Sequence, residues 1–185
     1  MTELPQLWEL AAYRQAAEIA ESEEQVQLAA AVAQAGVTLA DRARGATGHP
    51  VSVRVLGGTE LSGTVELATD ECLVLADGDD HRLIPAPAVV SLAVAQLPSA
   101  LPARGLERTG IRAIVRARLG AAVRVELDGD RSIVGVLVAV GRDYIAVESL
   151  SAQREGGIEL IPTDQLRWLG WRETAPPAAP DQSMN

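Results

Sequence analysis

Apolar and polar residues alternate along two stretches of the chain, the first of which begins at residue 51. Val51, Val53 and Val55 are separated by Ser52 and Arg54, which is the pattern of a strand with one buried face. Further short apolar runs, separated by turn residues, predict four more strands and a tight turn before the last. These elements are a second strand through Gly63, a third over 71–75, a fourth over 81–84, the tight turn over 85–88 and a fifth over 89–94.

The same pattern returns later in the chain, which indicates an internal repeat. Residues 51–75 superimpose on residues 123–147 without a gap, at an offset of 72. Residues 83–92 superimpose on residues 160–169, at an offset of 77. The extra residues of the second copy fall between its third and fourth strands, where a repeat tolerates an insertion. The chain is therefore predicted to contain two copies of one five-stranded unit.

Four glycines recur with the repeat and are predicted to be structural. Gly57 and Gly129 lie in the first turn of each copy, where glycine accepts the positive φ of a hairpin turn. Gly63 and Gly135 lie inside the second strand, where a glycine indicates a bulge or a sharp bend. Five short strands with the second one bent close most economically into a small barrel.

The segments outside the repeats are predicted to be helical or loose. Their composition favours helix at the N-terminus and just before each set of strands, over residues 37–44 and 111–119. The predicted fold class is α+β and mainly β, with two tandem five-stranded small barrels that each follow a short helix. The predicted domains are an N-terminal helical segment (1–36), a first barrel with its helix (37–97), a linker (98–106), a second barrel with its helix (107–172) and a disordered tail (173–185).

A helix followed by five strands, with a glycine bend in the second and a tight turn before the fifth, resembles the Sm-like barrel of the SH3-like small-barrel group. The start of the family's signature matches Gly63-Thr64-Val65 and Gly135-Val136-Leu137. The signature's Asn is absent, and Ala86–Ala88 and Thr163–Gln165 occupy the place of the family's Arg-Gly pair. The resemblance therefore implies the fold and not the family's uridine-binding pocket.

The whole arrangement also resembles a group of uncharacterised bacterial proteins from GC-rich genomes, some of which are labelled as regulators. Sm-like barrels pair the fourth strand of one barrel with the fifth strand of the next and so form rings. Tandem copies in one chain satisfy this edge internally, and Pro85, Pro87 and Pro162 near it remove backbone donors. We therefore expect a monomer or a homodimer rather than a hexameric or heptameric ring.

Charge is distributed unevenly along the chain. The net charge is −9 and the pI is about 4.7, which argues against a surface built as a whole to neutralise phosphates. All basic residues are Arg and there is no Lys, a bias typical of GC-rich codons. Residues 104–124, however, contain six arginines and one glutamate and carry a local charge of +5. This segment is therefore the part of the chain in which a nucleic-acid contact would be expected.

Within that segment, arginines recur every four residues, which on a helix forms a slowly drifting stripe. The candidate binding residues are Arg104, Arg108, Arg112, Arg116 and Arg118. Three interpretations remain open. The stripe is a solvated face, or it docks against the acidic N-terminal helix within one molecule or across a homodimer, or it contacts the phosphates of a nucleic acid.

No constellation of residues predicts catalysis. Recognised motifs for nucleophilic, metal-dependent or phosphate-cradling sites are absent, and the carboxylates fall mostly in turns. A single cysteine, Cys72, excludes an internal disulfide and a zinc site of several thiolates, and acidic neighbours favour a packed thiol over a reactive one. His81 is interpreted as an ordinary surface histidine. We predict neither a cofactor nor a metal.

The function predicted from these observations is that of a non-enzymatic binding or scaffold protein. It is expected to recognise an unknown protein partner or to associate with itself as a homodimer. The alternative is a regulator that contacts RNA or DNA through the arginines of residues 104–118. No leader segment and no apolar run long enough for a membrane span is present, so a cytoplasmic location without membrane contact is expected.

Overall fold

The computed structural model describes residues 35–100, 110–129, 131–150 and 157–173. The compact unit that carries the strands begins at Leu39, and residues 35–38 belong to a separate unit, Met1–Thr38. The predicted N-terminal helix up to residue 34, most of the linker and the tail lie outside the described residues.

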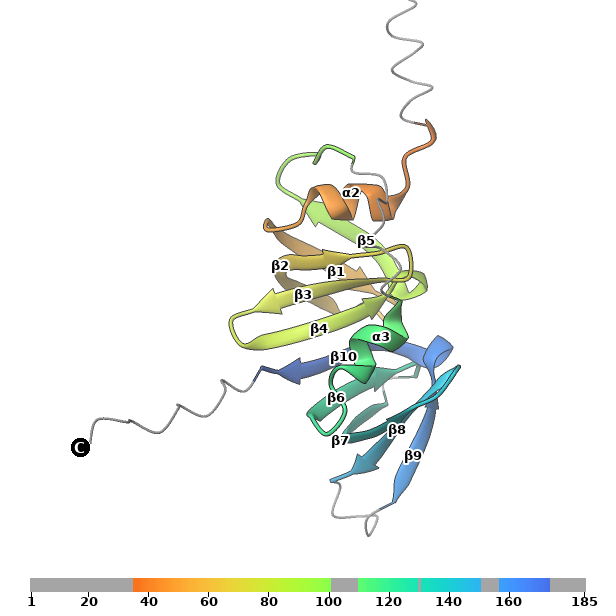
Figure 1. Cartoon of the computed structure of the whole chain (residues 1–185). Helices are drawn as coiled ribbons and strands as arrows, with labels where there is room; N and C mark the ends of the chain where they lie inside the picture. Colours follow the sequence, from red (N-terminus) through yellow and green to blue (C-terminus); the bar gives the residue numbers. More distant parts are fainter. Residues whose placement is uncertain (1–34, 101–109, 130, 151–156, 174–185) are drawn as a thin grey trace, which may run out of the picture. The chain divides into compact units, whose positions relative to one another are not determined.

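The described part of the chain is mainly β, as predicted, with short helices before each set of strands (Figure 1). The first half contains α2 (Leu39–Gly45), β1 (Pro50–Val55), β2 (Glu60–Ala68), β3 (Cys72–Asp77), β4 (Asp80–Pro85), the 3-10 turn η1 (Ala86–Ala88) and β5 (Val89–Val94). The second half contains α3 (Ile111–Arg116), β6 (Ala122–Leu127), β7 (Ser132–Val140), β8 (Tyr144–Ser149), β9 (Ile158–Pro162), η2 (Thr163–Gln165) and β10 (Leu166–Arg172).

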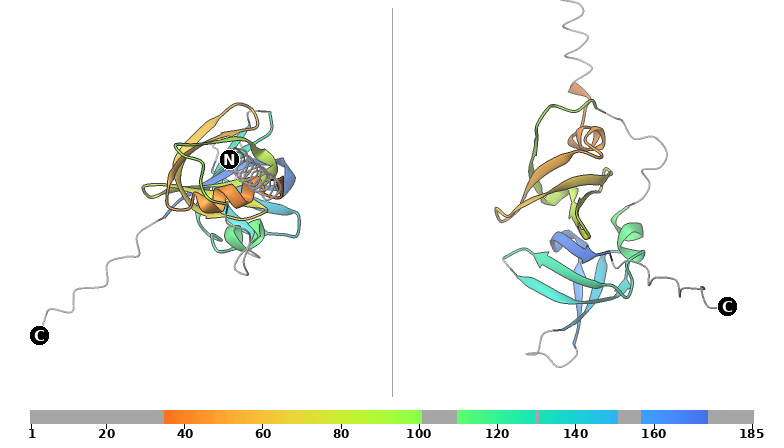
Figure 2. Two further views of the ribbon diagram at one scale, coloured as in Figure 1. Left: turned by 90° about the horizontal axis from the view of Figure 1, so that it is seen from above. Right: turned by 90° about the vertical axis from the view of Figure 1, so that its left-hand side faces the viewer.

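The strands form one open antiparallel sheet instead of two closed barrels, which corrects the expected closure. Their order is β5-β1-β2-β3-β4-β10-β6-β7-β8-β9, so that β5 and β9 are its two edges. Closure of the first half is prevented because β4 pairs with β10 and not with β5. Figure 2 shows that the strands of each half nevertheless curl strongly, as sheets do around a buried core. We call the junction of β4 with β10 the seam.

Strand pairing follows the sequence repeat residue by residue. Val51 pairs with Gly63 between β1 and β2, and Val123 pairs with Gly135 between β6 and β7, which is the same pair at an offset of 72. Likewise, β2 pairs with β3 and β7 with β8 with a register shift at the same place in each. The fifth strands also correspond, because Val53 pairs with Leu92 just as Val125 pairs with Leu169.

The repeat glycines occupy two kinds of special position. Gly57 and Gly129 have φ values of 86° and 77°, a conformation that favours glycine in the first turn of each half. Gly63 and Gly135 have ordinary backbone angles but lie against the neighbouring strand. A Cβ atom would lie 2.8 Å from the carbonyl oxygen of Ala76 at Gly63, and 2.2 Å from that of Glu148 at Gly135.

Two hydrophobic cores lie on opposite faces of the sheet and share residues across the seam. The core of the second half includes Cys72, Val74 and Leu83 from β3 and β4, with Ile111 of α3 packed against it. The core of the first half includes Trp168 from β10. As a result, β3, β4 and β10 have buried residues on both faces, whereas β6 alternates between buried and more exposed positions.

The seam also corrects the interpretation of His81, which is buried at 7% exposure and is not a surface residue. Trp171 of β10 is its partner in the register, and the two rings stack with centroids 5.5 Å apart. Nδ1 of His81 lies 2.8 Å from Glu66 and Nε2 lies 3.1 Å from Glu173. The sequence offered no sign of this burial because β10 lies about 90 residues further along the chain.

Candidate functional site

The predicted arginines separate into three groups in the structure. Arg112 and Arg116 are exposed on α3. Arg118 lies beyond the helix and packs inward, with its guanidinium carbon 5.0 Å from the centre of the Trp171 ring. Arg104 and Arg108 lie outside the described residues. The four-residue stripe therefore reduces, within the described chain, to two exposed arginines and one packed against a tryptophan.

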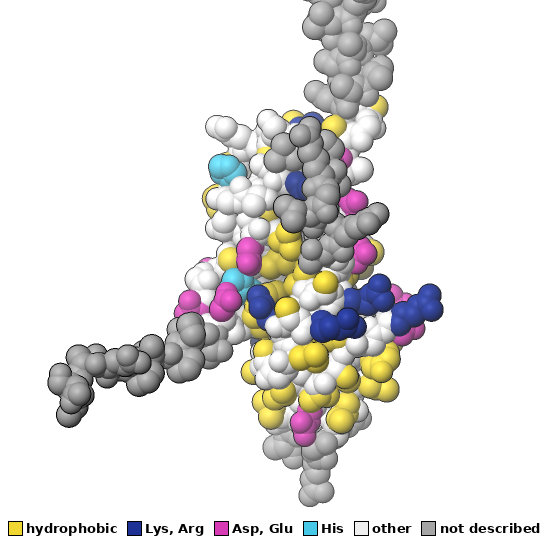
Figure 3. All heavy atoms as spheres, viewed as in Figure 1, with side chains coloured by type: hydrophobic (Ala, Val, Ile, Leu, Met, Phe, Trp, Pro, Cys, Tyr) yellow, Lys and Arg dark blue, Asp and Glu magenta, His cyan; other side chains and the backbone are white. Residues whose placement is uncertain are grey.

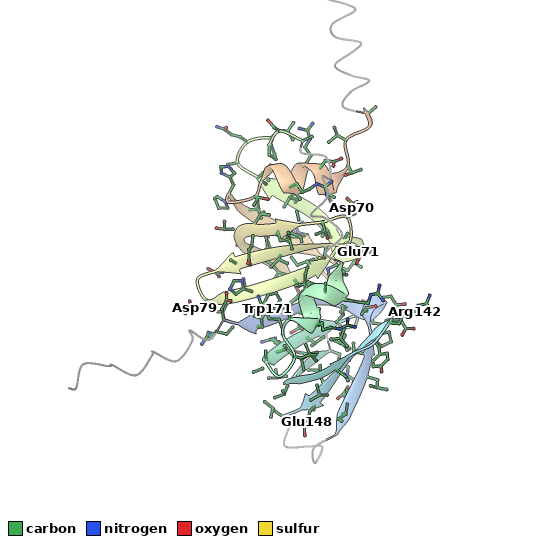
Figure 4. All side chains as sticks on the ribbon, viewed as in Figure 1. Asp70, Glu71, Asp79, Arg142, Glu148 and Trp171 are labelled. Atoms are coloured by element: carbon green, nitrogen blue, oxygen red, sulfur yellow. The ribbon has the colours of Figure 1, made fainter. Side chains whose placement is uncertain are left out.

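A third exposed arginine, Arg142, lies in the turn between β7 and β8. Figure 3 shows basic side chains gathered over α3 and this turn, and Figure 4 shows Arg142 there, at the end of the strands. Within the described residues, no carboxylate forms an ion pair with Arg112, Arg116 or Arg142. We call these three residues the basic corner.

Arg112 and Arg142 line a cleft of about 280 Å³ that contains residues of both halves. Glu71, also in its lining, accepts a hydrogen bond of 2.9 Å from the backbone N–H of Ile111 and so holds the start of α3 against the first half. The remaining walls come from the turns before the two fifth strands: Pro85, Pro87, Ala88, Thr163, Asp164 and Leu166, together with Leu56. The cleft thus offers two guanidinium groups beside two carboxylates and an apolar wall.

The equivalent corner of the first half has the opposite electrostatic character. Arg44 of α2 is 8% exposed, and it pairs with Asp41 and, at 3.0 Å, with Asp70. Burial lowers the pKa of Arg44, but its hydrogen bonds to Asp41 and Asp70 outweigh burial and leave the pKa raised. This closed ion-pair cluster has no free cation to offer a ligand.

At an offset of 72, the positions of Arg44, Asp41 and Asp70 become Arg116, Ala113 and Arg142. Both acids are lost in the second half, and one of them is replaced by another arginine. Among the described residues, Arg116 and Arg142 consequently have no ion-pair partner to hold them against the protein, and both are exposed. Reading charge along the sequence missed Arg142 because it lies outside residues 104–118, whereas its alignment with Asp70 in the repeat would have found it.

The free edge strand β9 forms a second candidate surface. Leu160 is 66% exposed and Ile158 is 60% exposed. Their repeat equivalents on β4 are Leu83, which is fully buried, and His81. The difference arises because β10 covers β4, whereas β9 ends the sheet. Large exposed apolar side chains on an edge strand are unfavourable in water and favour the addition of another strand.

Within the described ranges, no group of three or more His, Cys, Asp and Glu residues is placed to hold a metal ion. Burial raises the pKa of the Cys72 thiol, and the neighbouring Thr69 hydroxyl lowers it to a smaller extent. None of the helices described here has the length and apolar character to cross a membrane. The chain matches no protein-family model, and no curated protein matches it.

Proposed function

We propose that the protein is a non-enzymatic scaffold, built on two tandem Sm-like halves that share one open sheet, which binds protein partners or further copies of itself through the open edges of that sheet. The single observation that carries the proposal is the exposure of Leu160 and Ile158 on β9, compared with the burial of their repeat equivalents on β4. In the first half, another strand covers these positions. In the second half, the covering strand has to come from a second molecule.

The Sm-like character of each half is supported by its topology. Each half has a short helix, five strands in the order fifth-first-second-third-fourth and a second strand with an irregular register after its glycine. The fourth strand of the first half pairs with the fifth strand of the second, which agrees with the pairing expected between neighbouring Sm-like barrels. Pro85 at the end of β4 leaves the paired part of this edge intact because β10 pairs only with Asp80 to Leu83.

The energetic argument rests on apolar surface. Burying an exposed leucine or isoleucine contributes roughly 1.5–3 kcal/mol, and β9 exposes two such residues side by side on one face. Backbone groups of an edge strand add hydrogen bonds when a further strand pairs with it. Together these terms favour an edge-to-edge contact, whereas a charged substitution on β9 opposes it.

Light scattering on the full chain tests this proposal. We expect the wild type to give a mass above the 19.5 kDa of one chain, rising with concentration, and Leu160→Glu to give the mass of a single chain. Val134→Glu is the matched control, because Val134 is 51% exposed on β7, away from both edges, and should leave the mass unchanged. A wild type of 19.5 kDa at every concentration, or equal effects of both variants, would contradict self-association through the edge.

A second candidate function, binding of RNA or DNA, is favoured by the basic corner. Three exposed arginines that form no ion pair within the described residues lie on one face, although the chain as a whole is acidic. Guanidinium groups of this kind contact phosphates without reading sequence. No aromatic side chain lines the cleft, so the stacking platforms typical of single-strand binders are missing from it.

Binding of mixed-sequence oligonucleotides across a salt series tests this candidate. We expect the wild type to bind at low salt and the variant with Arg112, Arg116 and Arg142 replaced by Ala to lose about three units of the log–log salt slope. The control variant removes the same charge from exposed, ion-paired arginines elsewhere: Arg54, Arg124 and Arg131. Equal losses in both variants, or no binding by the wild type, would exclude the basic corner as a nucleic-acid site.

A further inference from the structure

We infer that the cleft beside α3, lined by Arg112 and Arg142, is a binding site for a small apolar α-amino acid in its zwitterionic form. This inference goes beyond the proposed function, because it assigns a small-molecule ligand and does not depend on association through the edges of the sheet. The carboxylate of the ligand would lie against the two guanidinium groups and its ammonium group against Glu71 and Asp164. Its side chain would lie against the apolar wall.

The charged groups of the cleft are available to a ligand. Within the described residues, neither Arg112 nor Arg142 forms an ion pair, and the same holds for the carboxylates of Glu71 and Asp164. All four side chains are exposed, and Figure 4 shows Glu71 and Arg142 on the side of the molecule that carries α3. Two positive and two negative groups balance in the lining. A ligand with one charge of each sign therefore matches the cleft better than a phosphate dianion, which both carboxylates would repel.

Glu71 is held in a fixed position by the backbone of α3. One of its carboxylate oxygens, Oε2, accepts a hydrogen bond of 2.9 Å from the N–H of Ile111. Gly110 permits this approach, because a Cβ atom there would lie 2.5 Å from Oε2. A carboxylate has several acceptor sites, so Oε1 is still able to accept a hydrogen bond from an ammonium group. One negative group of the cleft is thus positioned in advance, which reduces the entropy lost on binding.

The two arginines come from different elements of the second half. Arg112 lies in the first turn of α3, and Arg142 lies in the turn between β7 and β8. That turn is joined to η2, because the N–H and the hydroxyl of Thr163 donate to the carbonyl oxygen of Asp143 at 2.8 and 3.2 Å. These bonds bring Arg142 and Asp164 to the same cleft, so that a positive and a negative group share one wall.

The apolar wall comes chiefly from the first half. Pro85, Pro87 and Ala88, before β5, line it together with Leu56, which follows β1. Leu56 is 48% exposed, so covering its side chain with an apolar ligand is favourable. The volume of about 280 Å³ is small for a ligand pocket, and no aromatic side chain of the described residues lines it. A short aliphatic side chain, such as that of leucine, therefore fits the wall better than a nucleobase.

Calorimetric titration of the full chain with L-leucine tests the inference. Two analogues each remove one charge of the ligand: N-acetyl-leucine lacks the ammonium group, and leucinamide lacks the carboxylate. We expect saturable one-to-one binding of leucine and binding of either analogue that is weaker by about tenfold or more, because each analogue loses a charge-assisted contact. Inorganic phosphate, titrated in the same way, should also bind more weakly than leucine by about tenfold or more.

Four substitutions each remove one charge from the lining of the cleft: Arg112→Gln, Arg142→Gln, Glu71→Gln and Asp164→Asn. Each should weaken the binding of leucine by about tenfold. Glu71→Gln keeps a side-chain oxygen for the N–H of Ile111 and so preserves the start of α3. Arg116→Gln is the matched control, because Arg116 is also exposed on α3 but does not line the cleft. Its affinity for leucine should stay within about twofold of the wild type.

Absence of saturable leucine binding up to about 10 mM would overturn the inference. Binding of N-acetyl-leucine as tight as that of leucine would overturn the zwitterionic ligand, because the carboxylates of the cleft would then play no part. Tighter binding of phosphate, weakened equally by Arg112→Gln and Arg116→Gln, would overturn the inference in favour of an anion site on the basic corner. Association through β9 is measured separately by light scattering, and none of these results bears on it.

Discussion

Gly135 of β7 is a residue at which the neighbouring strand leaves no room for a side chain. A Cβ atom there would lie 2.2 Å from the carbonyl oxygen of Glu148 and 2.6 Å from Cγ1 of Val147, so that β7 and β8 would have to separate. We expect Gly135→Ala to lower the free energy of unfolding by about 3 kcal/mol, and Gly63→Ala, with its looser 2.8 Å approach, by about 1–2 kcal/mol. Urea unfolding of the two variants measures the difference.

Gly36→Ala is the control for this comparison, because no atom lies within 4 Å of a Cβ atom at that position. Its effect should remain within about 0.5 kcal/mol. If all three substitutions had similar effects, loss of glycine itself and not the close approach of the neighbouring strand would account for them.

The two corners show how a few residues change the character of one scaffold position. Arg44 is held by two acids and contributes to stability, whereas Arg116 and Arg142 at the equivalent places are exposed and unpaired within the described residues. A repeat allows this divergence because each half folds on the same apolar and glycine framework. Charged positions outside that framework are then free to acquire a binding role.

At the scale of secondary-structure elements, the seam depends on polar contacts as well as on its core. Arg172 at the end of β10 donates hydrogen bonds of 3.0 and 3.4 Å to Asp80 at the start of β4. These bonds from Arg172 are the main cause that lowers the pKa of Asp80 below its usual range. Because the Asp80 carboxylate is solvent-accessible, the contribution of this ion pair to the stability of the fold is small.

This lowered pKa predicts a pH-dependent effect of Asp80→Asn. The unfolded chain has the higher Asp80 pKa, so the stabilisation is present above the ordinary aspartate pKa of about 3.9 and is lost as the pH falls through the lower folded-state pKa. We therefore expect the wild type to be more stable than Asp80→Asn at pH 7, with the difference shrinking as the pH falls below the ordinary aspartate pKa of about 3.9. Thermal unfolding across this pH range measures it.

Asp79→Asn is the matched control, because within the described residues its carboxylate forms no ion pair with an arginine. Its stability should follow that of the wild type more closely at all pH values. A pH-independent difference for Asp80→Asn would mean that the side chain contributes through packing or turn geometry instead of through its charge.

The strands were predictable from sequence because their signals are local. Alternation from Val51 to Val55 and the turn before Val89 agree closely with the observed bounds of β1 and β5. The order of the strands was not predictable in this way, because pairing of β4 with β10 joins segments that are about 90 residues apart. This long-range pair keeps the sheet open and buries His81.

The candidate site was predictable only in part, for the same reason. Arg112 and Arg116 share a helix, so their spacing revealed a common face. Arg142 lies near Arg112 because the turn between β7 and β8 packs close to α3. Arg118 does not share their exposed face, because its guanidinium packs on Trp171 of a strand distant in sequence. Exposure of Leu160 likewise depends on which strand ends the sheet, and a sequence pattern does not specify that.

At the scale of the molecule, the two halves are not independently folding domains. Trp168 of the second half completes the first core, and Leu83 of the first half lies in the second core. If either half unfolded alone, core residues of the remaining half would become exposed to solvent. Residues 39–173 are therefore expected to behave as one cooperative unit.

Amide hydrogen exchange tests that cooperativity through a substitution far from the seam. Val53 is fully buried in the first core alone, and Val53→Ala should lower the free energy of unfolding by about 2–3 kcal/mol. If unfolding is cooperative, protection of the slowest amides in β6–β8 falls by the same amount as protection in β1–β3, since both exchange through global unfolding. Val125→Ala, the equivalent change in the second core, should likewise lower protection in β1–β3 by the same amount as in β6–β8. Loss of protection confined to the substituted half would instead mean that this half unfolds while the other stays folded, and the seam strand left exposed on the folded half, β4 or β10, would then compete with β5 and β9 for added strands.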